Sequence, residues 1–417
     1  GKVICYSYLP NTDLVTSKLT KNRDLILLRE FFVYDDCNNL IQMISDDGAS
    51  EDKDNLSNVT QRTLITYTLR QSPPFLHMPE WVEETYLEAG IEKLLKKSHL
   101  IYDPHGNVAQ EEVYDAEKTH AYTIHKTYNE RGDVLSETNR LGQTATYTYD
   151  PRGQLETGTN FSNRIRQTFF RDTKGRLKAQ MEQGDDGIVH ITSADYDFQS
   201  RKLRQKDPFQ NETHYTYDPL INEIIRTDFP PIASMDGQAT QVSTLSSYDP
   251  FGRELTKTDA NGNLKAYRYN AYGSPTEIVY PNGGRETFRY TKNGQLSHYT
   301  DPDGLTIYYK RDVLGRVLLK TYVSSSGQTL AEETFTYSGF NLLTATDQEG
   351  NLKKFVYDGA GRKTRTEFCG QVTDFSYDSL GYLATICKHN GNNTLVIRYK
   401  RDLEGQILEE SKTDTFG

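Results

Sequence analysis

The sequence predicts an all-β fold, a ribbon of β-hairpins made from one repeated unit, and three observations lead to this prediction. A Tyr-Asp-x-x-Gly pattern, or a close variant of it, recurs along most of the chain. The segments between its copies alternate apolar and polar residues and are rich in Tyr, Thr, Val and Ile, which is typical of strands. The copies often stand 21 residues apart, and a period of about 20–50 residues indicates a repeat architecture.

Fourteen copies mark the repeat, and Tyr248, Tyr269 and Tyr290 show its period most clearly, because they follow one another at 21-residue steps. Arg stands in place of Tyr in three copies, where we expect it to stack on a neighbouring ring or to reach a carboxylate. The first residues of the copies are Tyr102, Tyr128, Tyr149, Arg171, Tyr196, Tyr217, Tyr248, Tyr269, Tyr290, Arg311, Tyr337, Tyr357, Tyr377 and Arg401.

Each unit is predicted to contain two strands and two tight turns. In the Asp-x-x-Gly turn, Asp accepts hydrogen bonds from the backbone ahead of it, and Gly adopts the left-handed conformation that the turn needs. A second turn follows about ten residues later, as at 259–262. The candidate structural residues of the repeat turns are Tyr102, Asp103, Gly106, Tyr149, Asp150, Gly153, Tyr248, Asp249, Gly252, Tyr269, Gly273, Tyr357, Asp358, Gly361, Tyr377, Asp378 and Gly381.

The length of such a ribbon predicts that it cannot lie flat. Two strands for each copy give about 28 strands, which would extend on the order of 130 Å at the usual strand spacing. Twisted sheets seldom exceed about 10 strands without curling, splitting or flattening. We therefore expect the ribbon to coil, close or stack, and a spiralling, barrel-like wall around a hollow space is one solution.

The chain is predicted to have two parts, an N-terminal β-rich segment over residues 1–93 and the repeat ribbon over residues 94–417. In the first part, Tyr34 begins a further unit, in which Asn38 replaces the glycine. Residues 79–89 predict one short helix, because Pro79 stands at its start, glutamates fall in its first turns and Gly90 follows it.

Composition excludes several classes of function. The chain has 417 residues and a net charge of -10, which argues against a protein that binds nucleic acid through its phosphates. No apolar run approaches the length of a membrane span, and no signal-peptide pattern is visible. The four cysteines form no CxxC pair and are expected to be reduced structural thiols. The abrupt start and end suggest a piece of a longer polypeptide.

A search for chemistry predicts no catalytic, cofactor-binding or metal-binding residues and no cofactor, so the chain is not expected to be an enzyme. His120 and His125 are the closest pair of histidines, and in a strand they would point to opposite faces. The aspartates that follow the repeat tyrosines recur too often to form one special site. The acidic stretch 46–54 lacks the ligand order of an EF-hand, so a solvated loop is favoured over a weak Ca²⁺ site.

With its series of Tyr-Asp-x-x-Gly copies, the chain resembles the RHS/YD-repeat family from about residue 94 to the end, and more weakly back to Tyr34. The number of copies at one period makes the resemblance specific. It is strongest to bacterial members, the polymorphic toxins and the B/C components of insecticidal toxin complexes. There the ribbon spirals into a hollow shell around a toxic C-terminal domain, which is released by self-cleavage. The teneurins share the repeat on animal cell surfaces.

This resemblance implies a structural section of a shell that encloses and helps to deliver a toxin or effector domain located outside this chain. It implies a location outside the bacterial cell after export, with a delivery-channel component as a further partner. The alternative is a cell-surface or carbohydrate-binding module, since tyrosine faces can stack on sugars, although packing across strands is favoured. No Asp-Pro-rich segment followed by a variable domain is present, so the resemblance supplies neither cleavage residues nor a toxic activity.

Overall fold

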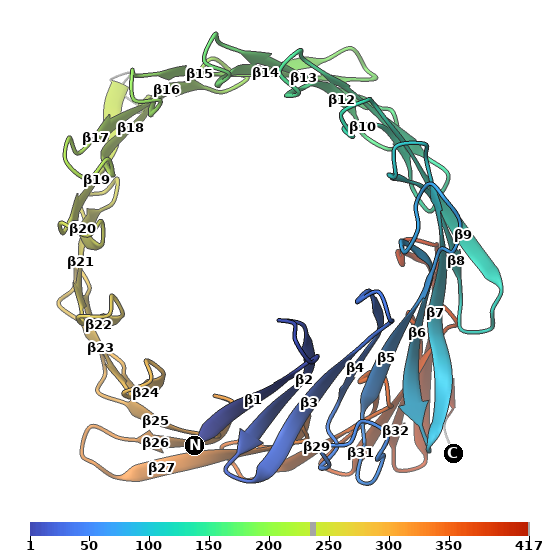
Figure 1. The fold of residues 1–417 in the computed structure, drawn as a ribbon. Coiled ribbons are helices and arrows are strands. Elements are labelled where there is room, and N and C mark those ends of the chain that lie inside the picture. The colour runs from blue at the N-terminus through green and yellow to red at the C-terminus, as the bar shows by residue number, and fades with distance from the viewer. Residues whose placement is uncertain (234–238, 416–417) are drawn as a thin grey trace. The chain divides into compact units, whose positions relative to one another are not determined.

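The computed structural model describes residues 1–233 and 239–415. All of the helices and strands assigned within these residues are β-strands (Figure 1). The 34 strands form an antiparallel sheet in which consecutive strands pair, as β19, β20 and β21 do. The all-β prediction is confirmed.

The first ten strands are β1 (Lys2–Tyr8), β2 (Val15–Asn22), β3 (Leu25–Tyr34), β4 (Leu40–Asp46), β5 (Arg62–Leu69), β6 (Pro79–Glu88), β7 (Ile91–Tyr102), β8 (Val108–Tyr114), β9 (His120–Tyr128) and β10 (Val134–Thr138). The next sixteen are β11 (Thr144–Tyr149), β12 (Leu155–Thr159), β13 (Ile165–Arg171), β14 (Leu177–Gly184), β15 (Val189–Tyr196), β16 (Lys202–Lys206), β17 (Glu212–Tyr217), β18 (Ile224–Ala233), β19 (Ala239–Tyr248), β20 (Glu254–Thr258), β21 (Leu264–Tyr269), β22 (Pro275–Val279), β23 (Arg285–Tyr290), β24 (Leu296–Thr300), β25 (Thr306–Arg311) and β26 (Val317–Val323). The last eight are β27 (Thr329–Tyr337), β28 (Leu342–Thr346), β29 (Leu352–Tyr357), β30 (Lys363–Phe368), β31 (Gln371–Tyr377), β32 (Leu383–Asn390), β33 (Asn393–Arg401) and β34 (Ile407–Thr415).

The predicted helix over residues 79–89 is wrong, because this stretch is the strand β6. β6 pairs with β5 on one side and with β7 on the other, so its backbone hydrogen bonds go to neighbours. Two of its glutamates pair with lysines of β7: Lys97 Nζ lies 2.6 Å from Glu83 Oε1, and Lys93 pairs with Glu88. Trp81, Val82 and Tyr86 favour a strand, and in this pairing they outweighed the capping pattern.

The chain divides into two compact units. Unit 1 comprises residues 1–143, 310–320 and 331–417, and unit 2 comprises residues 144–309 and 321–330. The predicted division after residue 93 falls inside β7. The predicted boundary was based on where the sequence repeat begins, whereas the two units are defined by compactness. The predicted boundary therefore stays a prediction.

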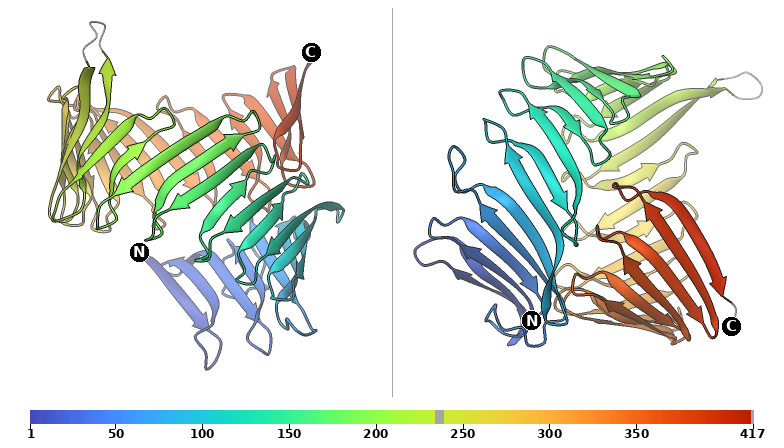
Figure 2. Two further views of the ribbon diagram at one scale, coloured as in Figure 1. Left: turned by 90° about the horizontal axis from the view of Figure 1, so that it is seen from above. Right: turned by 90° about the vertical axis from the view of Figure 1, so that its right-hand side faces the viewer.

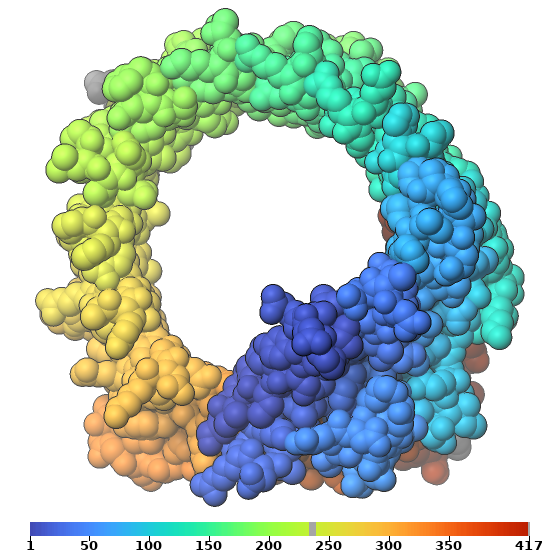
Figure 3. All heavy atoms as spheres, viewed as in Figure 1, coloured from blue at the N-terminus to red at the C-terminus, as the bar shows by residue number. Residues whose placement is uncertain are grey.

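Unit 2 is a single curved layer of hairpins (Figures 1 and 3). Of the eleven hydrophobic side chains that are buried among the described residues, Ala145 alone lies in unit 2. A layer of this kind has no thick apolar interior, so its stability depends on contacts between neighbouring hairpins.

Unit 1 brings the beginning and the end of the chain together. Its core consists of Leu19, Ile26, Phe31 and Ile44, from β2, β3 and β4. Hydrogen bonds also join residues of the first ten strands and their turns to the turns that follow β29 and β31. Figure 2 shows the last strands beside the first ones.

The Tyr-Asp-x-x-Gly turns all lie at one edge of the ribbon. Each turn joins an odd-numbered strand to the following even-numbered one, and antiparallel pairing sends all such connections to the same edge. The register shifts by a bulge just before the repeat residue, for example between Ser247 and Tyr248. Each turn is therefore a bulged hairpin connection that begins with the repeat tyrosine.

Candidate functional site

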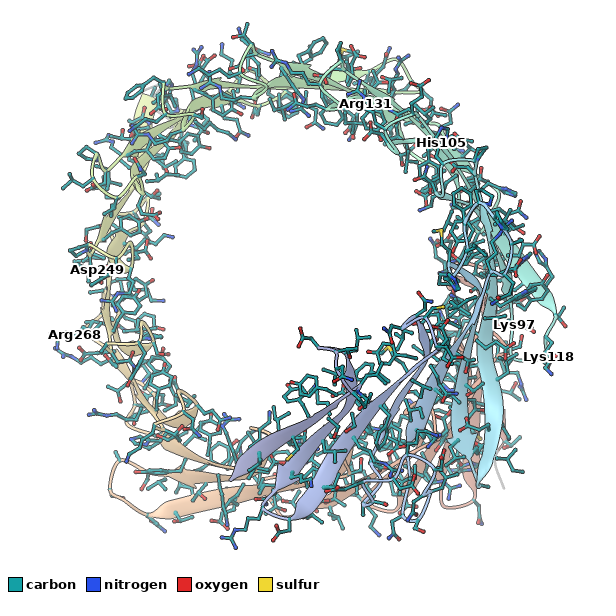
Figure 4. The ribbon with its side chains drawn as sticks, viewed as in Figure 1. Lys97, His105, Lys118, Arg131, Asp249 and Arg268 are labelled. Atoms are coloured by element: carbon teal, nitrogen blue, oxygen red, sulfur yellow. The ribbon has the colours of Figure 1, made fainter. Side chains whose placement is uncertain are left out.

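The Asp249 turn shows how one repeat turn is built (Figure 4). The Asp249 amide donates to the Arg253 carbonyl at 2.9 Å, and the Gly252 amide donates to the Asp249 carbonyl at 3.0 Å. The Asp249 carboxylate accepts from the amides of Phe251 and Arg253 at 2.9 and 3.1 Å. Gly252 has φ of 78°, in the left-handed region where a side chain adds strain.

The arginine after the glycine links one turn to the next. Arg253 Nη1 donates to the Asn270 carbonyl at 3.0 Å, and its guanidinium lies 5.2 Å from the centre of the Tyr269 ring. The same ring contact joins Arg176 to Tyr196 and Arg316 to Tyr337. A unit with this arginine therefore holds the tyrosine of the following unit, through charge and ring contact.

The tyrosine hydroxyl completes the link. Tyr269 Oη donates at 2.8 Å to the carbonyl of Glu254, the first residue of β20. The pairing of β20 with β21 begins only at Thr256, so this carbonyl lies outside that ladder. Eight other tyrosines donate to the first residue of the preceding strand: Tyr34 to Val15, Tyr102 to Pro79, Tyr128 to Val108, Tyr196 to Leu177, Tyr217 to Lys202, Tyr248 to Ile224, Tyr290 to Pro275 and Tyr377 to Lys363.

Where arginine replaces the tyrosine, it donates to backbone carbonyls. Arg401 Nε donates to Leu383 O at 3.0 Å, and Arg171 Nη2 donates to Leu155 O at 3.4 Å. Both acceptors are again first residues of the preceding strand. The guanidinium of Arg401 also stacks on a ring, as expected, because it lies 5.2 Å from the centre of the Tyr399 ring. At Arg171 and Arg401 the open carbonyl, rather than the expected carboxylate, is the acceptor.

The other predicted turn residues occupy equivalent places. Asp103, Asp150, Asp358 and Asp378 each accept from the amide of the glycine three residues later. Burial raises the pKa of the Tyr357 hydroxyl, and Tyr149 ends β11. Positive φ values are found at Gly106, Gly153, Gly252, Gly273, Gly361 and Gly381. We propose that these residues stabilise the hairpin connections.

Sequence reasoning missed the partner of the turn aspartate. In five turns an arginine four residues on pairs with the second carboxylate oxygen, as Arg316 Nε does with Asp312 at 2.7 Å. Elsewhere Asn takes this place, and Asn107 Nδ2 donates to Asp103 at 3.0 Å. A signal was present, because Arg or Asn stands four residues after the aspartate in these units, directly after the turn glycine or, in the Asp197 turn, after Ser200.

These contacts lower the pKa of the turn aspartates. The Asn107 amide is the main cause at Asp103, and the Arg176 guanidinium is the main cause at Asp172. At Asp249 burial raises the pKa, but the hydrogen bonds from Arg253 outweigh it and the net change is a decrease. The ionised carboxylate is therefore the form that the folded turn binds.

We expect the fold to lose stability in acid. A carboxyl whose folded pKa is lowered contributes stability above the unfolded value of about 3.8, and this contribution is lost as pH falls through the folded pKa. The urea midpoint should stay level between about pH 7 and 5 and fall below about pH 4. An Asp103→Asn, Asp172→Asn variant should show a shallower fall, because asparagine keeps the acceptor oxygen and does not titrate. An equally steep fall would contradict the assignment.

The hydroxyl of Tyr269 can be tested directly. Tyr269→Phe should lower the free energy of unfolding by about 1 kcal/mol, because the Glu254 carbonyl loses its donor. Tyr272→Phe is the matched control, since Tyr272 is 90% exposed at the tip of the adjacent turn. Urea denaturation of both variants is the measurement. Equal effects would show that the hydroxyl bond does not contribute.

A buried ion-pair cluster lies in unit 1, outside the repeat turns. Asp46 is fully buried and pairs with Arg29 Nε and, at 3.3 Å, with Arg62 Nη1. The Arg29 guanidinium also donates to three carbonyls of the following loop, those of Ser50, Asp52 and Asn55, at 2.8, 2.6 and 2.7 Å. The acidic loop is therefore not simply solvated, because it wraps around the guanidinium of Arg29.

A groove of about 710 Å³ lies on unit 1, against β6, β7 and the turn after β8. Trp81 and Tyr114 line it. Lys97 and Lys118, which also line it, are labelled in Figure 4. The Trp81 ring stacks on His99 at 4.2 Å between centres. In the described part of the chain, no group of three or more His, Cys, Asp or Glu side chains is placed to hold a metal ion.

The fold and these turns define a class, a repeat protein built as a single antiparallel ribbon of hairpins that are closed by Tyr-Asp-x-x-Gly turns. Family models identify the repeat. The model described as Teneurin YD-shell matches residues 235–416, and the model described as RHS Repeat matches residues 128–162. Residues 128–162 and 235–416 therefore match the models of RHS and YD repeats, and the resemblance seen in the sequence is confirmed.

Individual relatives agree with this family. The double-stranded DNA deaminase toxin A of Burkholderia cenocepacia (strain H111) is 33% identical over 135 residues, which cover 27% of this chain and 9% of that protein. The crystal structure of TcdB2-TccC3-Cdc42 matches with 13% identity and a TM-score of 0.71, over 95% of this chain and 24% of that one. The Photorhabdus luminescens Tc holotoxin pore matches with 13% identity and a TM-score of 0.69, over 96% and 25%.

The structural matches show a shared fold, and this chain spans about a quarter of the length of those chains and 9% of the curated relative. The described part of the chain contains no helix with the length and apolar character needed to cross a membrane.

Proposed function

We propose that this chain is a section of the wall of an RHS/YD-repeat shell, which encloses a toxin or effector domain located outside these residues. The match of the YD-shell model to residues 235–416 carries the proposal. The relative named as a deaminase toxin and the Tc toxin structures support a role in toxin proteins. In this proposal the wall itself performs no catalysis.

The construction of unit 2 supports a wall rather than a compact body. Its strands form one curved layer, and its apolar side chains are seldom buried (Figure 3). Links between consecutive turns, such as Arg253 to Tyr269, make such a layer continuous without a thick core. A layer of this kind encloses volume with little protein mass, which suits a container for another domain.

The proposal is tested on the complete polypeptide that carries these residues. Electron microscopy should show a hollow wall with additional density inside it. Protease treatment at pH 7 should leave the enclosed domain intact, and treatment after exposure to about pH 3 should degrade it, because the turn aspartates contribute less stability as the pH falls below the unfolded aspartate pKa. A compact particle without an internal space would overturn the proposal. We further propose export from a bacterium and contact with a delivery-channel component.

A second proposal, recognition of a glycan or a cell-surface partner, is favoured by the groove at Trp81 rather than by the repeat tyrosines. Those tyrosines direct their hydroxyls to the backbone, as Tyr269 does. The groove offers aromatic side chains together with charged groups such as Lys97 and Glu83. A glycan array should give a signal that Trp81→Ala abolishes. An array without signal for the folded chain would exclude this role.

A further inference from the structure

Three consecutive repeat turns near the end of the chain contact the first strands, all within unit 1. They are the turns 338–341, 358–361 and 378–381, which follow β27, β29 and β31. In Figure 2 the last strands lie beside the first ones. We call these three turns and the backbone that they contact the seam.

The middle turn fits most tightly. The Arg62 amide donates to the Gly359 carbonyl at 3.3 Å, and the Arg362 guanidinium lies 5.4 Å from the centre of the Tyr86 ring. A Cβ atom on Gly359 would overlap the carbonyl oxygen of Leu87. The backbone of Gly359 has no positive φ, so the need for glycine here comes from the contact and not from the turn.

The turn 338–341 contacts residues in β3, just after β4 and just before β5. Asn341 Nδ2 donates to Gln61 Oε1 at 2.6 Å. A Cβ atom on Gly339 would lie 2.7 Å from the Cβ of Asp47 and 3.0 Å from the carbonyl oxygen of Leu27. Gly339 also has no positive φ, so close approach again explains the glycine.

The third turn is hydrogen-bonded to the hairpin between β8 and β9. The Ala116 amide donates to the Ser379 carbonyl at 3.0 Å. Next to it, Arg140 Nη1 donates to Tyr382 Oη at 2.9 Å, and the same guanidinium lies 4.8 Å from the centre of the Tyr122 ring. Tyr122 is only 7% exposed, so this contact is closed to water.

Glycine at the second position distinguishes two of these turns from the rest. Their second positions hold Gly339, Gly359 and Ser379. The equivalent position in the other turns holds a side chain of at least alanine size: Asp36, Pro104, Glu130, Pro151, Thr173, Phe198, Pro219, Pro250, Ala271, Lys292, Val313 and Leu403. The two glycines found at this position therefore both lie in turns of the seam, and the third seam turn has a serine there.

We infer that the seam is a docking surface between the last repeats and the first strands of the same chain, and that the missing side chain at Gly339 and Gly359 is what lets these two turns dock. Residues 1–143 and 331–417 then gain protection from each other, and the seam is the place where unit 1 opens. This inference goes beyond the shell proposal and does not depend on it.

Hydrogen exchange of the full chain tests the seam. Gly359→Ala should speed exchange at the Arg62 amide by about tenfold or more, because the new methyl group separates that amide from the carbonyl at residue 359. Exchange at Ala116 should also accelerate. Ala271→Val is the matched control, since it adds more volume at the same position of an exposed turn in unit 2, and it should leave both amides unchanged.

A second variant approaches the seam from the opposite side. Arg140→Ala leaves the turn 378–381 intact but removes the donor to Tyr382, so exchange at Ala116 should accelerate while the paired amides of β31 and β32 keep their rates. If Gly359→Ala fails to fold, this variant decides the question. Unchanged exchange at Ala116 in Arg140→Ala, or at Arg62 in a folded Gly359→Ala, would overturn the inference.

Discussion

Arg29→Leu is expected to lower the free energy of unfolding of unit 1 by about 3–5 kcal/mol, because it leaves a buried charge without its partner. Arg29 and Asp46 both have side chains with 0% exposure. Without the guanidinium, Asp46 keeps Arg62, whose Nη1 lies 3.3 Å away, and the Gly48 amide, which donates at 3.0 Å. The carbonyls of the loop after β4 also lose their donors, so this loop should become sensitive to protease.

The control for this variant is an ion pair between β2 and β3, beside Arg29. Lys18 and Glu30 pair at 2.5 Å, with side chains that are 33% and 35% exposed. Lys18→Leu should cost less than about 1 kcal/mol, because water compensates the remaining charge. The double variant Arg29→Leu, Asp46→Leu should recover part of the loss, since no unpaired charge stays buried. Urea denaturation measures all three, and equal costs for Arg29→Leu and Lys18→Leu would contradict the prediction.

Gly252→Val is the second variant with a large expected effect, a loss of about 1–3 kcal/mol in the free energy of unfolding. Gly252 has φ of 78°, a conformation that a β-branched residue adopts only with strain. Space is not the limit, because the nearest atom to a Cβ there would be Glu223 Oε1, at 3.5 Å. The cost therefore comes from the backbone.

The variant Gly252→Asn is the control. It shows whether the cost comes from backbone strain or from any replacement of the glycine. Asn38 and Asn222 occupy the equivalent place in their own turns, with φ of 66° and 61°. Gly252→Asn should thus be much milder than Gly252→Val in a thermal melt, because asparagine tolerates this conformation. A Gly252→Val protein that melts like the unsubstituted chain would show that the turn does not need this φ.

The repeat turns were predictable because their determinants lie close together in sequence. Asp249, Gly252 and the aromatic residue at 248 lie within five positions of each other, so composition and spacing alone indicate a hairpin connection. The arginine at 253 was equally visible, but its partner Tyr269 belongs to the next unit and was not connected to it.

The helix prediction for residues 79–89 failed because contacts outside the segment decide its conformation. Its signals were local, Pro79 at the start and Gly90 at the end. The pairing of β6 with both of its neighbours was not visible in the segment itself. Where a strand is held on both sides, tertiary pairing outweighs capping preference.

The sequence by itself determined the repeat, the strands between its turns and the positions of the turn glycines, because these follow from interactions within one unit. Only the tertiary structure decided the contacts that bring distant residues together. The fit of Gly359 against the backbone at Leu87 depends on strands far apart in the chain, and the burial of Arg29 against Asp46 depends on how the loop after β4 folds over the pair. No local pattern of charge or size could specify which residues would meet there.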